Sequence, residues 1–276
     1  MNIIKFIESL TDQNLNSTGS RRESLSKFKA FGANAALASL PLGLASMALV
    51  PQKANAAAIQ SNESPTSALQ LALTLEYLED EFYKTALNTA DLIPLEDRPT
   101  FEQISQHEND HVEFLKAGLG NNAGAKPNFD FTAGGAFDPF GDYAQFLALA
   151  QAFEDTGVRA YKGQAGNLIT TPDLLQAALQ IHSVEARHAA QVRRIRTKNG
   201  LVIGQKGWIM GNNRGGLPEA AQDVYNGEEL TTQAGFNTAN VALSIGGTSG
   251  ANSGSESFDE PISGSVATTI ASLFIV

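Results

Sequence analysis

The sequence predicts an all-α protein, a four-helix bundle built from two helical hairpins joined by a long crossover. Three observations support this fold class. Four stretches between Pro65 and Lys198 place apolar residues at intervals of three and four, the period of amphipathic helices. The links within each hairpin are short, whereas the link between the hairpins is long. The two hairpins also repeat the same residue types at a nearly constant interval, which indicates an internal duplication.

Boundary signals mark each predicted helix. The first and fourth begin at Ser64-Pro65 and Thr171-Pro172, where a capping hydroxyl precedes a proline in the first turn. Glycines follow the second and end the third. The crossover from Asn121 to Gly141 is rich in Gly, Pro and Phe and has no helical period. The expected helices span residues 65–88, 99–117, 141–164 and 172–198.

The repeat is clearest in its polar residues. The aligned pairs, 77 or 78 residues apart, are Glu76 and Glu154, Tyr83 and Tyr161, Glu108 and Glu185, and His111 and His188.

The bundle, residues 65–199, follows a linker at 57–64 and precedes a C-terminal extension at 200–276. The extension is rich in Gly, Asn and Ser and shows little periodicity until residues 265–274, where a short helix or strand is expected. We expect it to consist mainly of irregular loops packed on or beside the bundle.

The first 56 residues have the charged, apolar and small-residue order of an export signal. Arg21-Arg22 precede a Gly- and Pro-diluted apolar run, which resembles the bacterial twin-arginine signal, although Ser24 stands where an apolar residue is usual. The alternative is a transmembrane anchor, because the run is near the length that spans a membrane. The signal interpretation predicts a periplasmic or extracellular protein with no stable membrane insertion after cleavage.

Composition excludes several classes of function. The chain has 29 acidic and 19 basic residues, and this excess of negative charge argues against nucleic-acid binding. It contains no cysteine, so disulfides, thiolate catalysis, iron–sulfur clusters and Cys-ligated zinc are excluded. Any metal must be held by oxygen atoms or imidazole, a ligand set that suits iron or manganese and does not exclude zinc.

Two Glu-x-x-His motifs each place a carboxylate and an imidazole on one helix face. Each partner helix adds a glutamate in apolar surroundings. Because burial of an isolated carboxylate costs several kcal/mol, such glutamates indicate a compensating cation. The predicted ligands of two divalent ions are Glu76, Glu108, His111, Glu154, Glu185 and His188, and the four glutamates are also the predicted catalytic residues.

Other residues near these motifs are weaker candidates. Glu79 lies one turn after Glu76 and is an alternative ligand, but Gly157 occupies its counterpart position, so Glu76 is preferred. His182 is a candidate to support a ligand, whereas His107 is expected to point elsewhere.

Tyr83 and Tyr161 lie two turns, or about 10 Å, beyond Glu76 and Glu154 on the same helix faces. We expect mainly core packing of both tyrosines. A hydrogen bond to a group around the ligands, or electron relay, is the alternative.

On these motifs the chain resembles the ferritin-like superfamily, in particular bacterial ferritin-like domain proteins described as desiccation-related. The resemblance covers Pro65 to Lys198, where one Glu from each of two helices meets a Glu-x-x-His from each of the other two. The roles it implies are bridging for Glu108 and Glu185, terminal for Glu76 and Glu154, and single-ion binding for His111 and His188.

The resemblance implies a dinuclear metal protein that is redox-active toward peroxide, oxygen or ferrous iron. Its partners would be metal ions and small oxidants. The alternative is a structural or stress-related envelope scaffold whose bundle binds metal or has lost it. The ligand count favours the first hypothesis, and the acidic Gly/Asn/Ser-rich extension, which minimal ferritins lack, keeps the second open. Iron and manganese accept the same ligands, so the sequence leaves their choice open, as it leaves homo-oligomerisation open.

Overall fold

The computed structural model describes residues 63–240 and 251–276. The predicted export signal and nearly all of the predicted linker lie outside this part of the chain. Helices make up most of its regular structure, which confirms the all-α class. None of these helices is long and apolar enough to cross a membrane.

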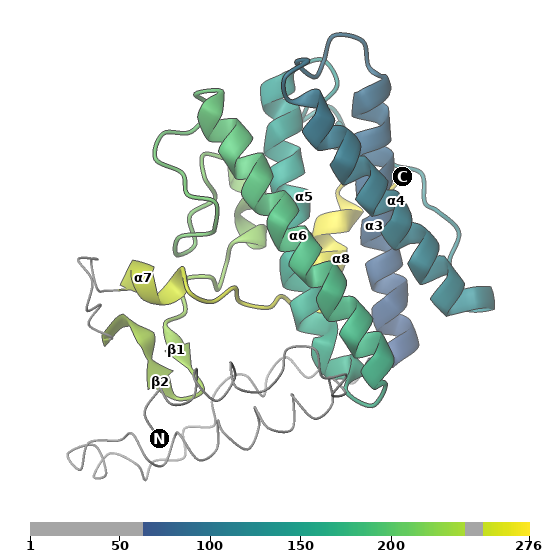
Figure 1. Ribbon diagram of the computed structural model, residues 1–276, viewed down its shortest axis with the longest axis vertical. Helices are drawn as coiled ribbons and strands as arrows, with labels where there is room; N and C mark the ends of the chain where they lie inside the picture. Colours follow the sequence, from purple (N-terminus) through teal and green to yellow (C-terminus); the bar gives the residue numbers. More distant parts are fainter. Residues whose placement is uncertain (1–62, 241–250) are drawn as a thin grey trace, which may run out of the picture. The chain divides into compact units, whose positions relative to one another are not determined.

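Four long helices lie side by side (Figure 1). They are α3 (Pro65–Asn88), α4 (Arg98–Leu119), α5 (Tyr143–Gln164) and α6 (Pro172–Lys198). The closest packing joins α3 to α4 and α5 to α6, so helices adjacent in sequence form hairpins. Their ends lie within two residues of the predicted limits, because apolar period and boundary residues are local properties of the sequence.

Side-chain caps explain where two of these helices begin. The Ser64 hydroxyl accepts a hydrogen bond from the Ser67 amide at 3.1 Å, directly before the proline that opens α3. Asp142 caps α5 in the same way by accepting from the Ala144 amide at 2.8 Å. The predicted cap at Thr171 is wrong. Its hydroxyl donates backward to the carbonyl of Leu168, the last residue of the 3₁₀ helix Ala165–Leu168, and makes no cap bond to α6.

The crossover between the hairpins supplies part of the core. Its Phe131 and Phe140 rings pack 5.3 and 5.7 Å from the Phe82 ring of α3. Phe146 and Phe153 of α5 contact the same ring at 5.1 and 5.0 Å. Complete burial of a phenylalanine side chain stabilises a fold by about 1.5–3 kcal/mol, so this cluster holds the long connection against the helices.

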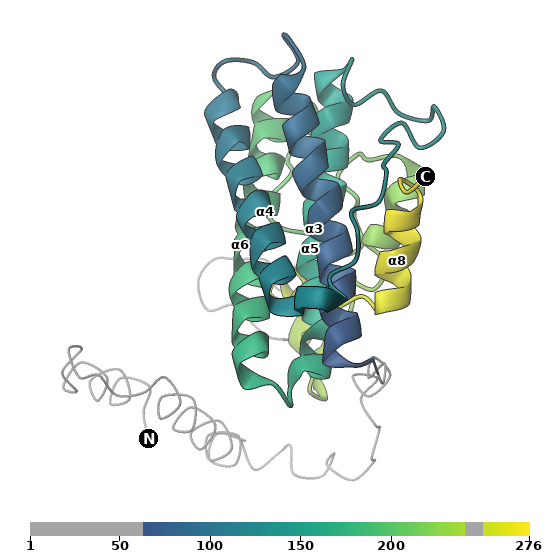
Figure 2. The same ribbon diagram turned by 90° about the vertical axis from the view of Figure 1, so that its right-hand side faces the viewer.

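The C-terminal end of the chain packs against the same core. Helix α8 (Gly264–Ser272) lies beside α3 and α5 (Figure 2). It buries Ala267 and Ile270, and Phe274 packs on the Phe153 ring at 4.9 Å. The helix-or-strand prediction for residues 265–274 therefore resolves as a helix. Beyond it, Ile275 pairs with Phe129 of the crossover.

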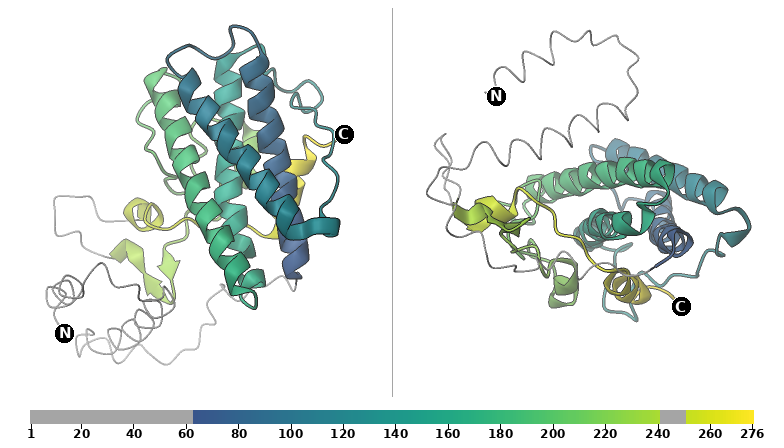
Figure 3. Two further views of the ribbon diagram at one scale, coloured as in Figure 1. Left: turned by 45° about the vertical axis from the view of Figure 1, so that its right-hand side comes forward. Right: turned by 90° about the horizontal axis from the view of Figure 1, so that it is seen from below.

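Residues 200–240 are mainly loops near α5 and α6 (Figure 3). They contain the 3₁₀ helices Glu219–Val224 and Thr238–Asn240 and the short strands β1 (Thr232–Gln233) and β2 (Phe236–Asn237). The short helix α7 (Ala251–Ser255) follows later in the chain.

Arg159 of α5 fastens these loops to the helices. It is 1% exposed, pairs with Glu228 at 2.7 Å and donates to the carbonyls of Val224, Asn226 and Glu260. The C-terminal region is thus joined to α5 by buried polar contacts as well as by apolar packing.

Candidate metal centre

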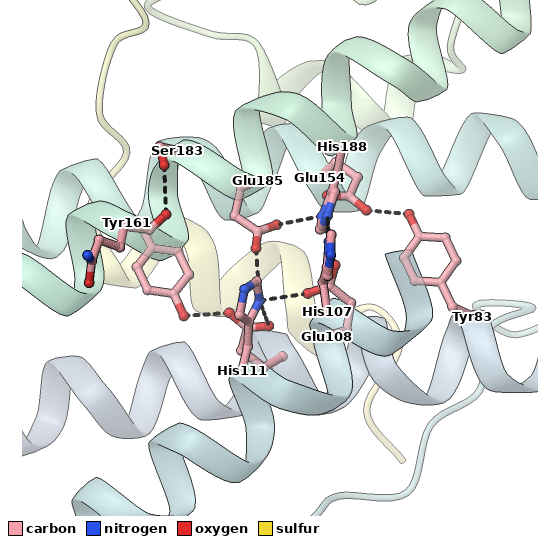
Figure 4. Close-up of polar contacts among 11 residues, drawn as sticks. Tyr83, His107, Glu108, His111, Glu154, Tyr161, Ser183, Glu185 and His188 are labelled. Atoms are coloured by element: carbon pink, nitrogen blue, oxygen red, sulfur yellow. Dashed lines mark hydrogen bonds and ion pairs between the residues drawn. The ribbon is translucent and has the colours of Figure 1, made fainter. Parts of the chain in front are cut away.

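The four long helices direct the six predicted ligands into one interior site (Figure 4). All four glutamates are 0% exposed. The side chains of His188 and His111 are 6% and 12% exposed. The three-residue spacing on α4 and on α6 places each Glu and His on the same inward face.

Two overlapping groups of ligand atoms form the site. In each group, one nitrogen or oxygen atom per residue lies within 4.8 Å of all the others. The first group is Glu76, Glu108, His111 and Glu185, and the second is Glu108, Glu154, Glu185 and His188. Glu108 and Glu185 belong to both groups, so each has oxygen atoms near both positions where a cation would sit.

His111 faces three carboxylates with one ring nitrogen. Its Nδ1 atom lies 3.0 Å from Glu108 Oε2, 3.2 Å from Glu76 Oε2 and 3.3 Å from Glu185 Oε1. Burial alone would lower the pKa of this imidazole, but the three carboxylates raise it well above 6.5. The position therefore strongly favours a positive charge.

His188 occupies the equivalent place in the second group. Its Nδ1 atom lies 2.8 Å from Glu108 Oε1 and 3.2 Å from Glu154 Oε2. Burial again opposes the charged form, but the negative charge of Glu154 and the contact with Glu108 raise the pKa of His188 to about 11.

Several buried atoms of the site lack a well-aligned hydrogen bond and face one another only as ion-pair contacts. In the described ranges nine buried side-chain atoms are unsatisfied, and five belong to this site: Glu108 Oε1, Glu154 Oε2, Glu185 Oε1, Glu185 Oε2 and His188 Nδ1. Each unsatisfied polar atom costs about 1–3 kcal/mol, and more when charged. Carboxylate oxygens and imidazole nitrogens facing one another in this way fit iron or manganese as ligands.

Two tyrosines hold the terminal glutamates from outside. Tyr83 donates a 2.5 Å hydrogen bond to Glu154 Oε1, and Tyr161 donates one of the same length to Glu76 Oε1. Burial, followed by the nearby carboxylate charge, raises the pKa of both phenols well above 10, so both remain donors.

The expectation that these tyrosines mainly pack in the core was therefore incomplete. The pairs Glu76–Tyr161 and Tyr83–Glu154 have opposite order along the two helices, so α3 and α5 are antiparallel. A tyrosine two turns from the glutamate on its own helix consequently lies opposite the glutamate of the other. The spacing of residues along one helix does not show which residue of the other helix a tyrosine will contact.

The prediction that His107 points elsewhere is wrong. Its Nδ1 atom lies 2.9 Å from Nε2 of His188, with the ring planes 15° from parallel, and the Gln103 amide contacts its other nitrogen at 2.8 Å. His182 instead hydrogen-bonds the Val158 carbonyl at 2.9 Å and therefore supports the backbone of α5. Only the relative rotation of α4 and α6 decides which of these two histidines reaches a ligand.

Comparison with known families agrees with this arrangement. The model of the ferritin-like domain family matches residues 64–198, which include all four long helices and all six residues of the site. No curated protein matches the chain. The match supports the ferritin-like superfamily, and the buried Glu and His groups are able to hold metal.

Proposed function

We propose that residues 65–199 form a ferritin-like four-helix bundle that binds two divalent ions of iron or manganese and is redox-active toward peroxide, oxygen or ferrous iron. The observation that carries this proposal is the concentration of unsatisfied carboxylate and imidazole atoms between two ligand groups that share Glu108 and Glu185. A merely structural interior would give these atoms well-aligned hydrogen bonds or replace them by apolar side chains.

Charge supports two ions in particular. Four ionised glutamates in one buried site carry four negative charges, which repel strongly where water does not screen them. Two divalent cations neutralise that charge, and two neutral imidazoles complete the ligand set. One divalent ion would leave two negative charges buried, at a cost of several kcal/mol for each.

The protein's own residues prepare the ligands. Tyr161 occupies Glu76 Oε1, which leaves Oε2 of that glutamate facing Nδ1 of His111 at 3.2 Å. Tyr83 does the same for Glu154, whose Oε2 faces Nδ1 of His188 at 3.2 Å. Each terminal glutamate therefore offers one oxygen atom to the site. When bound, iron or manganese would supply the one-electron chemistry that amino-acid side chains lack.

The exposure of the six side chains indicates the route by which a small substrate would reach the site. The glutamates are fully enclosed, and His111 has the most exposed side chain of the six residues. A small oxidant would reach the centre beside His111, while the enclosed glutamates exclude bulk water and larger reductants.

We also propose export through a twin-arginine-type signal at residues 1–56, giving a periplasmic or extracellular protein of the desiccation-related type. The order of charged, apolar and small residues in the sequence supports this proposal.

Metal analysis tests the central proposal. The full chain, expressed with iron and manganese supplied, should contain about two equivalents of metal and should turn over peroxide or oxidise ferrous iron. The double variant Glu108→Gln/Glu185→Gln should lose both metal and turnover. The control Glu102→Gln/Glu113→Gln changes two exposed glutamates of α4 and should behave as wild type. If the protein contained no stoichiometric metal and chelators did not change its melting temperature, the metal-free scaffold would be favoured instead.

A further inference from the structure

The two halves of the site differ at one position. In the repeat that aligns Glu76 with Glu154, Glu79 of α3 corresponds to Gly157 of α5. A Cβ atom added to Gly157 would lie 3.1 Å from Glu185 Oε2 and 3.4 Å from Glu79 Oε1. Both carboxylates thus border the space that a side chain at position 157 would need.

Glu79 is buried without a compensating charge. It is 2% exposed, and none of the ion pairs in the described part of the chain includes it. It lines a small cavity, about 10 Å³ in volume, whose other walls are Leu75, Leu78, Phe153, Thr156, Ile270 and Ala271. The one hydroxyl there, on Thr156, donates to the Ala152 carbonyl of its own helix. A cavity of this size holds at most one water molecule.

The electrostatic surroundings join Glu79 to the four glutamates of the site. Burial raises the pKa of Glu79 well above 4.5, and the charges of Glu185, Glu154, Glu108 and Glu76 raise it further, in that order. The two strongest of these neighbours, Glu185 and Glu154, both belong to the group that contains His188.

The position of the Glu185 carboxylate also places Glu79 near the group that contains His188. Its Oε1 atom lies 3.3 Å from His111 Nδ1, whereas its Oε2 atom is the one 4.0 Å from His188 Nδ1. Oε2 is also the atom that borders the space at Gly157 together with Glu79.

We propose that Glu79 is a fifth carboxylate of the metal centre, serving the ion held by the His188 group, and that Gly157 is the position that admits it. This inference rests on the proposed function. With two divalent ions, five carboxylates leave one net negative charge. That charge would favour a trivalent over a divalent ion at one of the two positions. Glu79 would thus make the two metal positions unequal and lower the reduction potential of one of them.

Titration of the apoprotein with Mn²⁺, followed by calorimetry and by the electron paramagnetic resonance of free Mn²⁺, tests the assignment. Wild type should bind two equivalents. Glu79→Gln, which has the shape of a protonated glutamate, should bind one of them about tenfold or more weakly, the range seen when groups around a metal site are removed. Gly157→Ala keeps Glu79 but fills its space and should weaken the same equivalent. The control Glu81→Gln changes a half-buried glutamate of α3 paired with Lys126 and should leave both affinities unchanged.

The outcomes separate this inference from the function on which it rests. In the iron-loaded protein, Glu79→Gln should also raise the reduction potential, a shift that a packing role would not produce. Two equivalents bound by Glu79→Gln with wild-type affinities and potential would overturn the role of Glu79 and leave the dinuclear centre standing. Wild-type protein that binds no Mn²⁺ or iron would overturn both. If Gly157→Ala does not fold, Glu79→Gln decides alone.

Discussion

Tyr161 of α5 donates a 2.5 Å hydrogen bond to Glu76 of α3 and thereby connects the two helical hairpins at the candidate metal centre. The reciprocal bond from Tyr83 to Glu154 repeats this relationship about the axis of the internal duplication. Each hairpin therefore orients a ligand of the other, and neither hairpin has a complete site by itself.

Tyr161→Phe should weaken metal binding and destabilise the loaded protein. It leaves Glu76 Oε1 buried without its donor, and loss of a hydrogen bond to a charged group costs about 1.5–3 kcal/mol. Tyr83→Phe should have a similar effect on the other ion. Chemical denaturation and metal titration measure both. Tyr77→Phe is the control, because the Tyr77 hydroxyl contacts the Gly124 carbonyl outside the site. Equal metal affinity in all three variants would contradict an orienting role.

Removal of metal should leave a protein whose stability falls as the pH rises. Burial raises the pKa of Glu108 and Glu185 above 4.5, and carboxylates outweigh burial to raise the pKa of His111 and His188 above 6.5. Above pH 4.5 the folded apoprotein therefore binds more protons than the unfolded chain, and its stability falls as the pH rises. The glutamates contribute to this fall from about pH 4.5 upward. His188 contributes between pH 6.5, where the unfolded imidazole loses its proton, and about 11, where the folded one does.

Metal binding should displace these protons, so metal affinity should increase with pH. The difference in melting temperature between loaded and chelator-treated protein should therefore widen from pH 5 to pH 8. A difference that stays constant, or an apoprotein that becomes more stable with rising pH, would contradict the charge assignment.

His107→Phe should weaken binding of the ion near His188 by about 10- to 100-fold, as is typical for loss of a partner that orients a histidine ligand. In the described part of the chain, His107 is the group that hydrogen-bonds His188 Nε2. The visible absorption spectrum of the Co²⁺-loaded protein reports this change in one of two sites. His182→Phe should keep both affinities, because His182 bonds to backbone.

Arg159→Met should cost about 3–5 kcal/mol of folding free energy, because it leaves Glu228 buried without its partner. Limited proteolysis should then cut first between residues 224 and 260. The double variant Arg159→Met/Glu228→Gln should recover part of the loss. Equal stability of the single and double variants would show that the ion pair is not the cause.

Changing both Arg21 and Arg22 to lysine should stop export and leave uncleaved precursor in the cytoplasm. Cell fractionation followed by immunoblotting measures this. Unchanged export would favour the general secretory route or a membrane anchor.

The sequence by itself determined the helices and the six candidate ligands of this protein. Apolar period and boundary residues are local, so they placed the limits of α3 to α6 within two residues. The duplicated Glu-x-x-His motifs identified Glu108, His111, Glu185 and His188, because residues three apart share a helix face whatever the tertiary fold.

Only the tertiary structure decided which side chains surround those ligands. Tyr161 meets Glu76 because α3 and α5 run antiparallel, and His107 meets His188 because of how α4 and α6 are rotated about their axes. Glu79 borders the same space as Glu185 because Gly157 lacks a side chain between them. Contacts between helices depend on direction, rotation and axial offset, which are set by packing of the whole core and not by the period of any single helix.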